Sequence, residues 1–526
     1  MIYRSPYPDV TIPDVALTDH LFEHAERHAD RAALIDGPTG RTITYGELVT
    51  AIRCTAAGLT ERGFAKGDVF AIYSPNRPEY AVAFMGVAMA GGVNTTVNPL
   101  YTAGELKRQL IDAQAKFLVT IPPFLDKARE ACANTPVQEV FVFGEAEGAT
   151  PFSSLSQTDS APPTNIVDPR EDLVALPYSS GTTGMPKGVM LTHRNLVANL
   201  CQTDSVERLS AKDVLIGILP FYHIYGMVVI MGGALRTGAT IVTMPRFDLE
   251  QFLELIQRYA VTTAYLVPPI VLALAKHPLV DRYNLSTLQN ILSGAAPLPE
   301  PVARACASRH NLTVRQGYGL TETSPVTHAN GRDREVRVAS AGCAVPNTEC
   351  RIVDVQSGDD AAEGETGEVW VRGPQVMKGY LHNPEATRNM IDTEGWLHTG
   401  DIGYADADGY MFVVDRVKEL IKYKGLQVAP AELEAVLQAH PSVADAAVIP
   451  VPDEEAGEVP KAFVVLKPGT EPSSEALMSH VAERVAPHKR VRYVEFIDAI
   501  PKVPSGKILR RELRERERAT HENVTR

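Results

Sequence analysis

Short runs of β-branched and aromatic residues alternate with longer amphipathic stretches from about residue 40 to residue 320. Val69–Tyr73 has the composition of a buried strand, and the apolar spacing of Glu79–Met89 is typical of a helix. The same alternation recurs where Leu249–Ile256 predicts a helix and Val261–Val267 predicts a strand closed by Pro268 and Pro269. Strands that alternate with helices form parallel βαβ sheets with both faces covered, so we expect an α/β fold.

The composition supports a large globular chain. At about 150 residues per domain, 526 residues correspond to roughly three or four domains. The proportions of hydrophobic residues, 44%, and charged residues, 22%, exclude disorder for most of the chain. A formal net charge of −13 disfavours nucleic acid or a membrane surface as partner. The six cysteines lack metal-site or disulfide spacing, and no signal segment is evident, so we expect a cytoplasmic protein. We expect its partners to be small molecules and the protein itself to be a monomer or a homodimer.

The pattern changes after about residue 340. Between residues 340 and 415, short strands separated by glycine-rich turns predict a small antiparallel, barrel-like unit, with strands at Glu368–Arg372, Gly379-Tyr380 and Gly409–Val413. After residue 418 the pattern predicts a compact α+β unit with helices at Pro430–Gln438 and Glu475–Val485 and strands at Val443–Val451, Ala462–Leu466 and Val491–Ile497. The charged tail Arg510–Arg518 predicts a solvated helix.

Two domains follow from these patterns. We expect a large N-terminal domain over residues 1–417, built of two parallel βαβ sheet subdomains and a small β-barrel-like subdomain. We expect a small, mobile α+β domain over residues 418–526.

Four clusters of Gly, Ser, Thr and His residues come directly after predicted strands, at Ser179–Gly188, Pro220–Gly226, Ser293–Pro297 and Gly317–Glu322. In open parallel sheets, ligands bind beyond the carboxyl ends of the strands. The four clusters together therefore predict one composite binding site.

The first cluster has the chemistry of a phosphate-binding loop. Small residues let backbone N–H groups approach an anion, the hydroxyls of four Ser and Thr residues add donors, and Lys187 adds a positive charge. The order of residues does not fit a P-loop, and we find no GxGxxG pattern, which disfavours a nicotinamide enzyme.

The order Ser-Ser-Gly-Thr-Thr-Gly-x-Pro-Lys-Gly in Ser179–Gly188 resembles the signature loop of the adenylate-forming, or AMP-binding, superfamily. This superfamily includes acyl-CoA synthetases, luciferases and peptide-synthetase adenylation domains. Further matching motifs follow in order at Gly317–Glu322, Gly395–Asp401, Asp415–Lys422 and Pro501–Lys507. Within the superfamily the chain is most similar to 4-coumarate–CoA ligases, through Phe221–Tyr225, Ser293–Leu298 and Lys422–Glu432.

The resemblance implies two half-reactions. A carboxylate attacks the α-phosphate of ATP and expels pyrophosphate, and the thiol of coenzyme A then attacks the acyl-adenylate. The implied cofactors are ATP, Mg²⁺ and coenzyme A. The residues that the resemblance assigns to ATP and AMP binding are Ser179, Ser180, Gly181, Thr182, Thr183, Gly184, Lys187, Gln316, Gly317, Tyr318, Gly319, Thr321, Asp401, Arg416 and Lys507.

The resemblance also assigns roles in the reaction. Lys507 would supply the positive charge that the attack of one anion on another requires, and Glu322 would hold Mg²⁺. His223, Thr321 and Lys422 complete the implied catalytic set. The remaining implied residues are Lys422 and Gln427 in a loop near the carboxylate and thioester, Lys424 and Gly425 at the path of coenzyme A, and Lys418 at the hinge.

The implied pocket for the acid departs from that of 4-coumarate–CoA ligases at two positions. Its residues are His223, Tyr225, Val228, Tyr265, Leu292, Gly294, Ala295, Pro325 and Val326. Val228 stands where those ligases usually carry Asn, and Leu292 where they often carry Lys. Burial of a phenol hydroxyl without a partner costs about 1–3 kcal/mol, so we expect an acid with a less polar tail. A fatty acid, a cinnamate and another aryl acid all remain open.

Three other functions also remain open. An amino-acid-activating module would need an acidic residue for the ammonium group, and Phe221–Ile230 contains none. A luciferase-like oxygenase shares nearly every motif. A non-catalytic nucleotide-binding protein would have no need of the charged residues named above.

Overall fold

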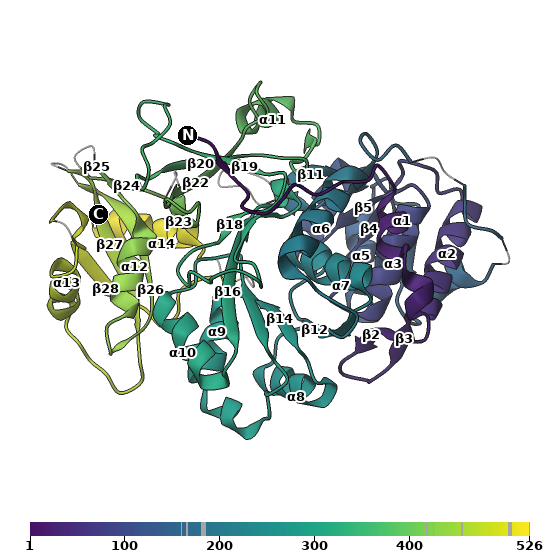
Figure 1. Ribbon diagram of the computed structural model, residues 1–526, viewed down its shortest axis with the longest axis horizontal. Coiled ribbons are helices and arrows are strands. Elements are labelled where there is room, and N and C mark those ends of the chain that lie inside the picture. The colour runs from purple at the N-terminus through teal and green to yellow at the C-terminus, as the bar shows by residue number, and fades with distance from the viewer. Residues whose placement is uncertain are drawn as a thin grey trace.

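The computed structural model describes residues 1–158, 160–164, 167–179, 186–416, 419–423, 426–453, 456–485, 487–502, 506 and 508–524, with only the backbone described at 426–427 and 519–524. The described chain folds around four sheets (Figure 1). Among these residues, no helix combines the length and hydrophobicity needed to cross a membrane.

Sheet I has a parallel centre of six strands. Its order is β18 (Cys343–Ala344), β17 (Val326–Ala329), β16 (Thr313–Gly319), β15 (Asn290–Ser293), β14 (Thr263–Leu266), β12 (Val214–Gly217), β13 (Thr240–Thr243), β2 (Ala32–Asp36) and β3 (Thr42–Thr44). The strands from β16 to β2 in this order run parallel. The helices α8 (Leu249–Tyr259), α9 (Pro268–Lys276) and α10 (Glu300–His310) connect its strands.

Sheet II is also mostly parallel. Its order is β10 (Tyr178–Ser179), β11 (Lys187–Thr192), β9 (Leu173–Ala175), β5 (Val93–Thr96), β4 (Val69–Ile72), β6 (Ala115–Thr120), β7 (Glu139–Val142) and β8 (Thr150–Pro151). Its connecting helices are α2 (Tyr45–Glu61), α3 (Pro78–Met89), α4 (Ala103–Asp112) and α5 (Leu125–Cys132).

One buried apolar cluster contains residues of both sheets, including Phe70 of β4 and Leu215 of β12. The same cluster contains residues of α1 (Leu17–Phe22), α6 (His193–Glu207), the π-helix η4 (Tyr225–Gly232) and α7 (Gly233–Thr237). Sheets I and II therefore share a core with these helices, which fixes the site loops of sheet I relative to those of sheet II (Figure 1).

Sheets III and IV complete the described fold. Sheet III is antiparallel, in the order β1 (Tyr3–Arg4), β19 (Glu349–Val353), β20 (Gly367–Arg372), β22 (Leu397–Ala405) and β23 (Met411–Arg416), and α11 (Pro384–Met390) lies in the connection between β20 and β22. Sheet IV contains β25 (Leu426–Val428), β24 (Ile421–Tyr423), β27 (Gly457–Leu466), β26 (Val443–Asp453) and β28 (Tyr493–Phe496). Three helices pack with sheet IV in the C-terminal part of the chain, on the left in Figure 1. They are α12 (Pro430–Gln438), α13 (Ser474–Ala482) and α14 (Arg510–Val524).

The α/β fold with two parallel sheets, an antiparallel sheet and a C-terminal α+β unit is confirmed. The boundary at residues 417/418 stays a prediction, because both residues lie outside the described part of the chain.

Two details differ from the sequence expectation. β21 (Gly379–Tyr380) pairs with β11 of sheet II instead of joining the antiparallel unit, since Val189 lies opposite Tyr380. A two-residue strand carries too little side-chain pattern to select its partner. The charged tail, α14, also buries one face, where Leu513 is 2% exposed and Arg510 contacts Glu434.

Candidate active site

Three of the four expected loops meet at one edge of sheet I. The strands β14, β15 and β16 run parallel and in register, with Leu266 beside Ser293 and Ser293 beside Gln316. The loops Ser293–Pro297 and Gly317–Glu322 therefore leave the sheet at the same edge, and Pro220–Gly226 follows the parallel strand β12. Of the fourth cluster, Ser179 ends β10 and Lys187 begins β11, and both strands belong to sheet II.

Lys187 and Glu322 converge on the ring of Tyr380. The Lys187 Nζ lies 4.9 Å from the centroid of the Tyr380 ring, and the Tyr380 hydroxyl donates a hydrogen bond to Glu322 Oε1 at 2.8 Å. Burial, followed by the charge of Glu322, raises the pKa of Tyr380 far above its usual value. Ser179 lies opposite Lys187 in the β10–β11 pair. The structure thus brings Lys187, at the end of the predicted phosphate-binding loop, and the Glu322 carboxylate, which is 5% exposed, to the same tyrosine ring.

A second polar group joins β16 to sheet III. The Tyr318 hydroxyl donates to Asp401 Oδ2 at 2.6 Å, and Arg416 Nε lies 3.1 Å from Asp401 Oδ1. Asp401 and Arg416 are directly paired across β22 and β23. Three residues expected to bind the nucleotide therefore lie together, although Tyr318 and Asp401 are 83 positions apart.

Close packing explains the glycines in these loops. A Cβ atom at Gly319 would lie 1.9 Å from the Pro325 carbonyl oxygen, and one at Gly294 would lie 2.9 Å from the Tyr225 ring. At Gly317 the nearest atom would be the His328 carbonyl oxygen at 3.3 Å. Gly319 and Gly294 therefore have no room for a side chain.

Side-chain amides hold the loops in place. Gln316 accepts a hydrogen bond from Leu298 N at 2.8 Å and donates to the carbonyl oxygen of Val338 at 2.5 Å. Asn199 of α6 holds Val326 by two hydrogen bonds, at 3.0 Å to its N–H and 2.8 Å to its carbonyl oxygen. Thr321 begins the short helix η6 (Thr321–Thr323), which overlaps the end of the Gly317–Glu322 loop. Pro325 follows this helix, directly before Val326.

The residues expected to bind the acid form an apolar wall. Tyr225 is 9% exposed, Tyr265 0%, Val228 2%, Leu292 4% and Val326 8%. The Tyr225 hydroxyl donates to the Leu292 carbonyl oxygen at 3.0 Å, and the rings of Tyr225 and Tyr265 meet edge to face with centroids 6.3 Å apart.

His223 lies at the open side of this wall, where its side chain is exposed. Its Nδ1 accepts a hydrogen bond from Tyr225 N at 3.3 Å, so the neutral ring carries its proton on Nε2. Ala295 is exposed as well, in a left-handed backbone conformation with φ of 68°.

The C-terminal unit contributes fewer described site residues. Lys422 is exposed on β24, where its N–H donates to Glu458 at 2.8 Å, and it lies opposite Gln427 of β25, whose side chain is not described. Gly506 lies against the N-terminal part, because a Cβ atom there would be 2.9 Å from Pro269 Cδ. The expected site residues Ser180, Gly181, Thr182, Thr183, Gly184, Lys418, Lys424, Gly425 and Lys507 lie outside the described part of the chain.

The structure also adds residues that the motifs did not reveal, namely Tyr380, Asn199, and the buried pair Glu207 and Arg315. Arg315 carries a sequence signal, because it is a charged residue inside a strand otherwise expected to be buried, directly before Gln316. Tyr380 carries none, since its role depends on the pairing of β21 with β11.

Two family models and individual relatives match this chain, and they agree with one another. The family described as AMP-binding enzyme matches residues 21–381, and the AMP-binding enzyme C-terminal domain matches residues 432–507. A 4-coumarate–CoA ligase 1 of Petroselinum crispum is 44% identical over 98% of this chain and 97% of its own length.

Two solved structures are similar over nearly the whole fold. ATP-bound MatB from Rhodopseudomonas palustris has a TM-score of 0.88 and 30% identity, covering 96% of this chain and 99% of that one. The apo structure of the same protein, with the same coverage, has a TM-score of 0.79. An anthranilate CoA ligase, AuaEII, in complex with anthranoyl-AMP has a TM-score of 0.88 and 27% identity, covering 96% of this chain and 98% of that one.

Proposed function

The chain belongs to the AMP-binding enzyme family and is an AMP-forming carboxylate–CoA ligase that uses ATP and coenzyme A, and we propose that its acid is hydrophobic: a cinnamate, another aryl acid or a fatty acid. The observation that carries the choice of acid is the apolar wall of Tyr225, Val228, Tyr265 and Leu292 at the edge of sheet I. Relatives named for 4-coumarate support an acid of similar size.

The first half-reaction joins two anions, so the site has to offset negative charge at the α-phosphate. Lys187 and the backbone of the Ser179–Gly184 loop bind the phosphates, while Tyr318, Asp401 and Arg416 hold the adenosine. Gln316, Gly317, Gly319 and Thr321 form the strand-end loop against the nucleotide, and His223 borders the acid carboxylate. These assignments rest on the matching motifs and on the convergence of the described side chains.

Lys507 acts on the α-phosphate during adenylation. Its neighbour Gly506 packs against Pro269 at the start of α9, close to the carboxyl end of β14 in sheet I. The higher TM-score with ATP-bound MatB than with apo MatB supports the view that this arrangement suits the ATP-bound step.

Mg²⁺ fits the donor set near Glu322. This ion binds one or two carboxylates together with phosphate oxygens and water, so a single buried carboxylate beside the phosphate loop suffices. When bound, the ion neutralises charge on the phosphates. Tyr380 orients Glu322 through its hydroxyl, and Lys187 Nζ lies over the face of the same ring.

The second half-reaction depends on the C-terminal unit. Lys422 and Gln427 replace Lys507 near the acyl group after rotation about Lys418, and Lys424 and Gly425 border coenzyme A. The exposed side chain of Lys422 is consistent with a contact that forms only after such a movement.

A screen of cinnamate, 4-coumarate, benzoate and fatty acids tests the proposal by pyrophosphate release with and without coenzyme A. We expect cinnamate or a fatty acid of similar length to exceed 4-coumarate in kcat/KM about tenfold, because Val228 and Leu292 offer the ring hydroxyl no side-chain partner. A kcat/KM for 4-coumarate tenfold above those for cinnamate and the fatty acids would contradict the proposal that the acid has a hydrophobic tail. Pyrophosphate release accompanied by oxygen uptake, without formation of a thioester, would indicate a luciferase-like enzyme. Pyrophosphate release with amino acids and with none of the other acids would indicate an amino-acid-activating module.

The role of Lys507 has its own test. We expect Lys507→Ala to slow adenylation about 10²–10³-fold, as for loss of one donor that stabilises a transition state. Thioester formation from added acyl-adenylate should change much less, and Lys502→Ala is the matched control because Lys502 pairs with Asp445. Equal loss in both half-reactions would contradict the assignment.

A further inference from the structure

The loop that carries His223 follows a strand of sheet I and is held from sheet II. It covers residues 218–224, between the carboxyl end of β12 and the start of η4. The His223 side chain is exposed. An exposed side chain has few packing contacts, so the backbone on either side strongly influences where the imidazole points. The contacts of this backbone therefore bear on the geometry of the site.

Asn76 makes three hydrogen bonds to the start of this loop. The residue lies in the connection from β4 to α3, in sheet II, and is buried. Its Nδ2 donates to the carbonyl oxygens of Gly217 at 2.9 Å and Leu219 at 2.8 Å. Its Oδ1 accepts from Phe221 N at 2.7 Å. A primary amide offers both N–H donors and an acceptor, so this one side chain matches all three backbone groups.

A second side chain of sheet II holds the residue next to His223. The Thr96 hydroxyl, at the end of β5, donates to the carbonyl oxygen of Tyr222 at 2.8 Å. The ring of Tyr80 packs edge to face on that of Phe221, with centroids 5.8 Å apart. Sheet II therefore contacts both of the residues that directly precede His223.

The loop is folded so closely that its first half constrains its second half. A Cβ atom at Gly226 would lie 2.2 Å from the Pro220 carbonyl oxygen and 2.7 Å from that of Leu219. The His223 N–H also donates to the Pro220 carbonyl oxygen, at 3.1 Å. A shift of the backbone at Leu219 is therefore transmitted to His223.

We propose that Asn76 and Thr96 are positioning residues, which hold His223 at the acid site through the backbone of residues 217–222. Two polar side chains of sheet II thus set where a residue of sheet I meets the acid carboxylate. The inference rests on the proposed function, since it assumes that His223 borders that carboxylate.

The experiment compares Asn76→Asp with Asn94→Asp. Asn94 of β5 is the matched control, because it is also buried and its Nδ2 also donates to two backbone carbonyl oxygens, those of Phe84 at 3.0 Å and Val174 at 3.3 Å. Each change removes the amide donors and keeps an oxygen acceptor. Pyrophosphate release gives kcat/KM for cinnamate and hexanoate and KM for ATP, and chemical denaturation gives the unfolding midpoint.

Asn76→Asp should lower kcat/KM for both acids about 10²-fold, because a displacement of about 1 Å at a reacting group has an effect of that size. KM for ATP should stay close to the wild-type value. Asn94→Asp should leave kcat/KM close to the wild-type value, although the unfolding midpoints of the two variants shift by similar amounts. An equal loss of kcat/KM in the two variants, with wild type active, would overturn this inference alone.

A milder pair of variants preserves the fold. Thr96→Val removes the hydroxyl that donates to Tyr222 O, whereas Thr95→Val removes a buried hydroxyl that donates to Leu176 O at 3.0 Å and accepts from Gln109 Nε2 at 3.0 Å. The control thus loses at least as many hydrogen bonds. Thr96→Val should lower kcat/KM for the acids about fivefold, as for loss of one hydrogen bond, and Thr95→Val should not lower it. Equal values for the two variants would overturn the inference, also where Asn76→Asp does not fold.

His223→Ala tests whether the effect passes through the histidine. In that background Asn76→Asp should lower kcat/KM for the acids little further, because changes that act through one contact are not additive. Full additivity would show that Asn76 acts on the site by another route and would overturn the inference. A His223→Ala enzyme with wild-type kcat/KM would contradict the role proposed for His223 and the inference with it. A wild type that releases no pyrophosphate with any acid would overturn the proposed function itself.

Discussion

Two buried glutamate–arginine pairs, one in each part of the molecule, differ in geometry and in surroundings. Glu207 and Arg315 join α6 to β16 through two parallel hydrogen bonds, one from each terminal nitrogen of the guanidinium. In the C-terminal unit, Arg510 Nη2 of α14 donates to both carboxylate oxygens of Glu434 of α12, at 2.8 and 2.9 Å. Each arginine thus connects segments that are distant in sequence.

The charged residues around the two pairs differ in sign. Arg332 adds a second positive charge near Glu207, whereas Asp415 shares Arg510 with Glu434. Burial raises the pKa of Glu434 to about 7, against the opposing attraction of Arg510. Burial likewise raises the pKa of Asp415, which ends the N-terminal part and accepts a hydrogen bond from Ala431 N at 2.8 Å.

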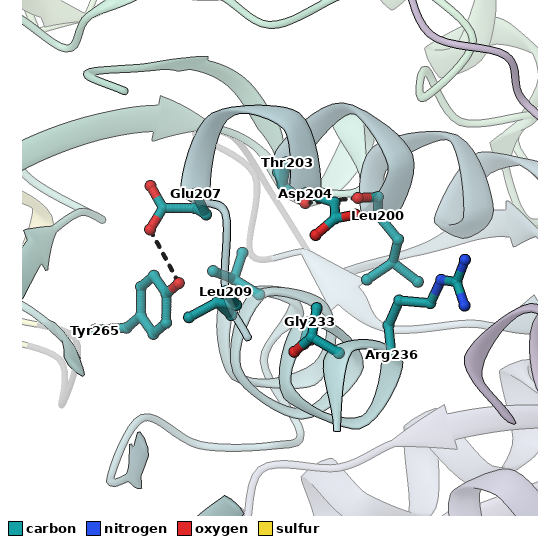
Figure 2. A pocket seen from close by; sticks show the side chains of 10 residues that line it. Leu200, Thr203, Asp204, Glu207, Leu209, Gly233, Arg236 and Tyr265 are labelled. Carbon is teal, nitrogen blue, oxygen red and sulfur yellow. Dashed lines mark hydrogen bonds between the residues drawn. The ribbon is translucent and has the colours of Figure 1, made fainter. Parts of the chain in front are cut away.

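The comparison indicates that the neighbouring charges set the direction in which the pKa of each buried carboxyl shifts. The pKa of Glu207 is lowered, and its carboxylate accepts a hydrogen bond from Tyr265 of the apolar wall (Figure 2). Glu434 titrates near neutral pH close to the junction with β23, where the predicted hinge requires contacts that can rearrange.

The largest effect is expected from Arg315→Met. The change leaves the Glu207 carboxylate buried without its main partner, which should lower the free energy of unfolding by about 3–5 kcal/mol. Chemical denaturation at neutral pH measures it. A loss below about 1 kcal/mol would show that Arg332 alone can support Glu207.

At pH 6, Arg510→Met should lower the free energy of unfolding by less than Arg315→Met does. Glu434 then takes up a proton and leaves an unsatisfied but neutral group, at a cost of about 1–3 kcal/mol. The cost should grow toward pH 8, where the carboxyl has to ionise. If Arg510→Met and Arg315→Met were equally destabilising at pH 6, the two pairs would be equivalent and the comparison would fail.

A further effect, spread over more than two pH units, is a difference between wild type and Glu434→Gln in how the free energy of unfolding depends on pH. Below pH 4.5 the Glu434 carboxyl is protonated in both states, and between pH 4.5 and about 7 only the folded state keeps the proton. This carboxyl therefore makes the free energy of unfolding fall as pH rises through that window, by about 3 kcal/mol at most. Glu434→Gln should remove this slope.

Glu207 should contribute with the opposite sign. Its pKa is lowered in the folded state, so the stability that it contributes is present above its unfolded pKa and is lost as pH falls. Parallel slopes for Glu434→Gln and wild type would contradict the raised pKa of Glu434.

The sequence predicted most of the fold and the place of the site. The alternation of strands and helices predicted β4, α3 and α8, and α12 begins and ends at the expected residues. The glycine-rich loops after parallel strands predicted that the Ser293–Pro297 and Gly317–Glu322 loops would meet, because strand direction alone brings their ends to one edge.

The sequence did not predict the contacts that complete the site. Tyr380 reaches Glu322 only because a two-residue strand pairs with β11, and Tyr318 reaches Asp401 only because β16 meets sheet III. Short strands and single charged residues have no periodicity, so nothing in the local pattern identifies their partners.

What the sequence determined by itself is therefore the set of loops and the chemistry of their residues, since turn glycines, hydroxyls and apolar runs act through local backbone geometry. Only the tertiary structure decided that Glu207 and Arg315, 108 positions apart, form an ion pair and that the Tyr265 hydroxyl donates to its carboxylate. A buried ion pair is stable only where folding brings both charges together and excludes water, and that condition arises from the packing of α6 on sheet I.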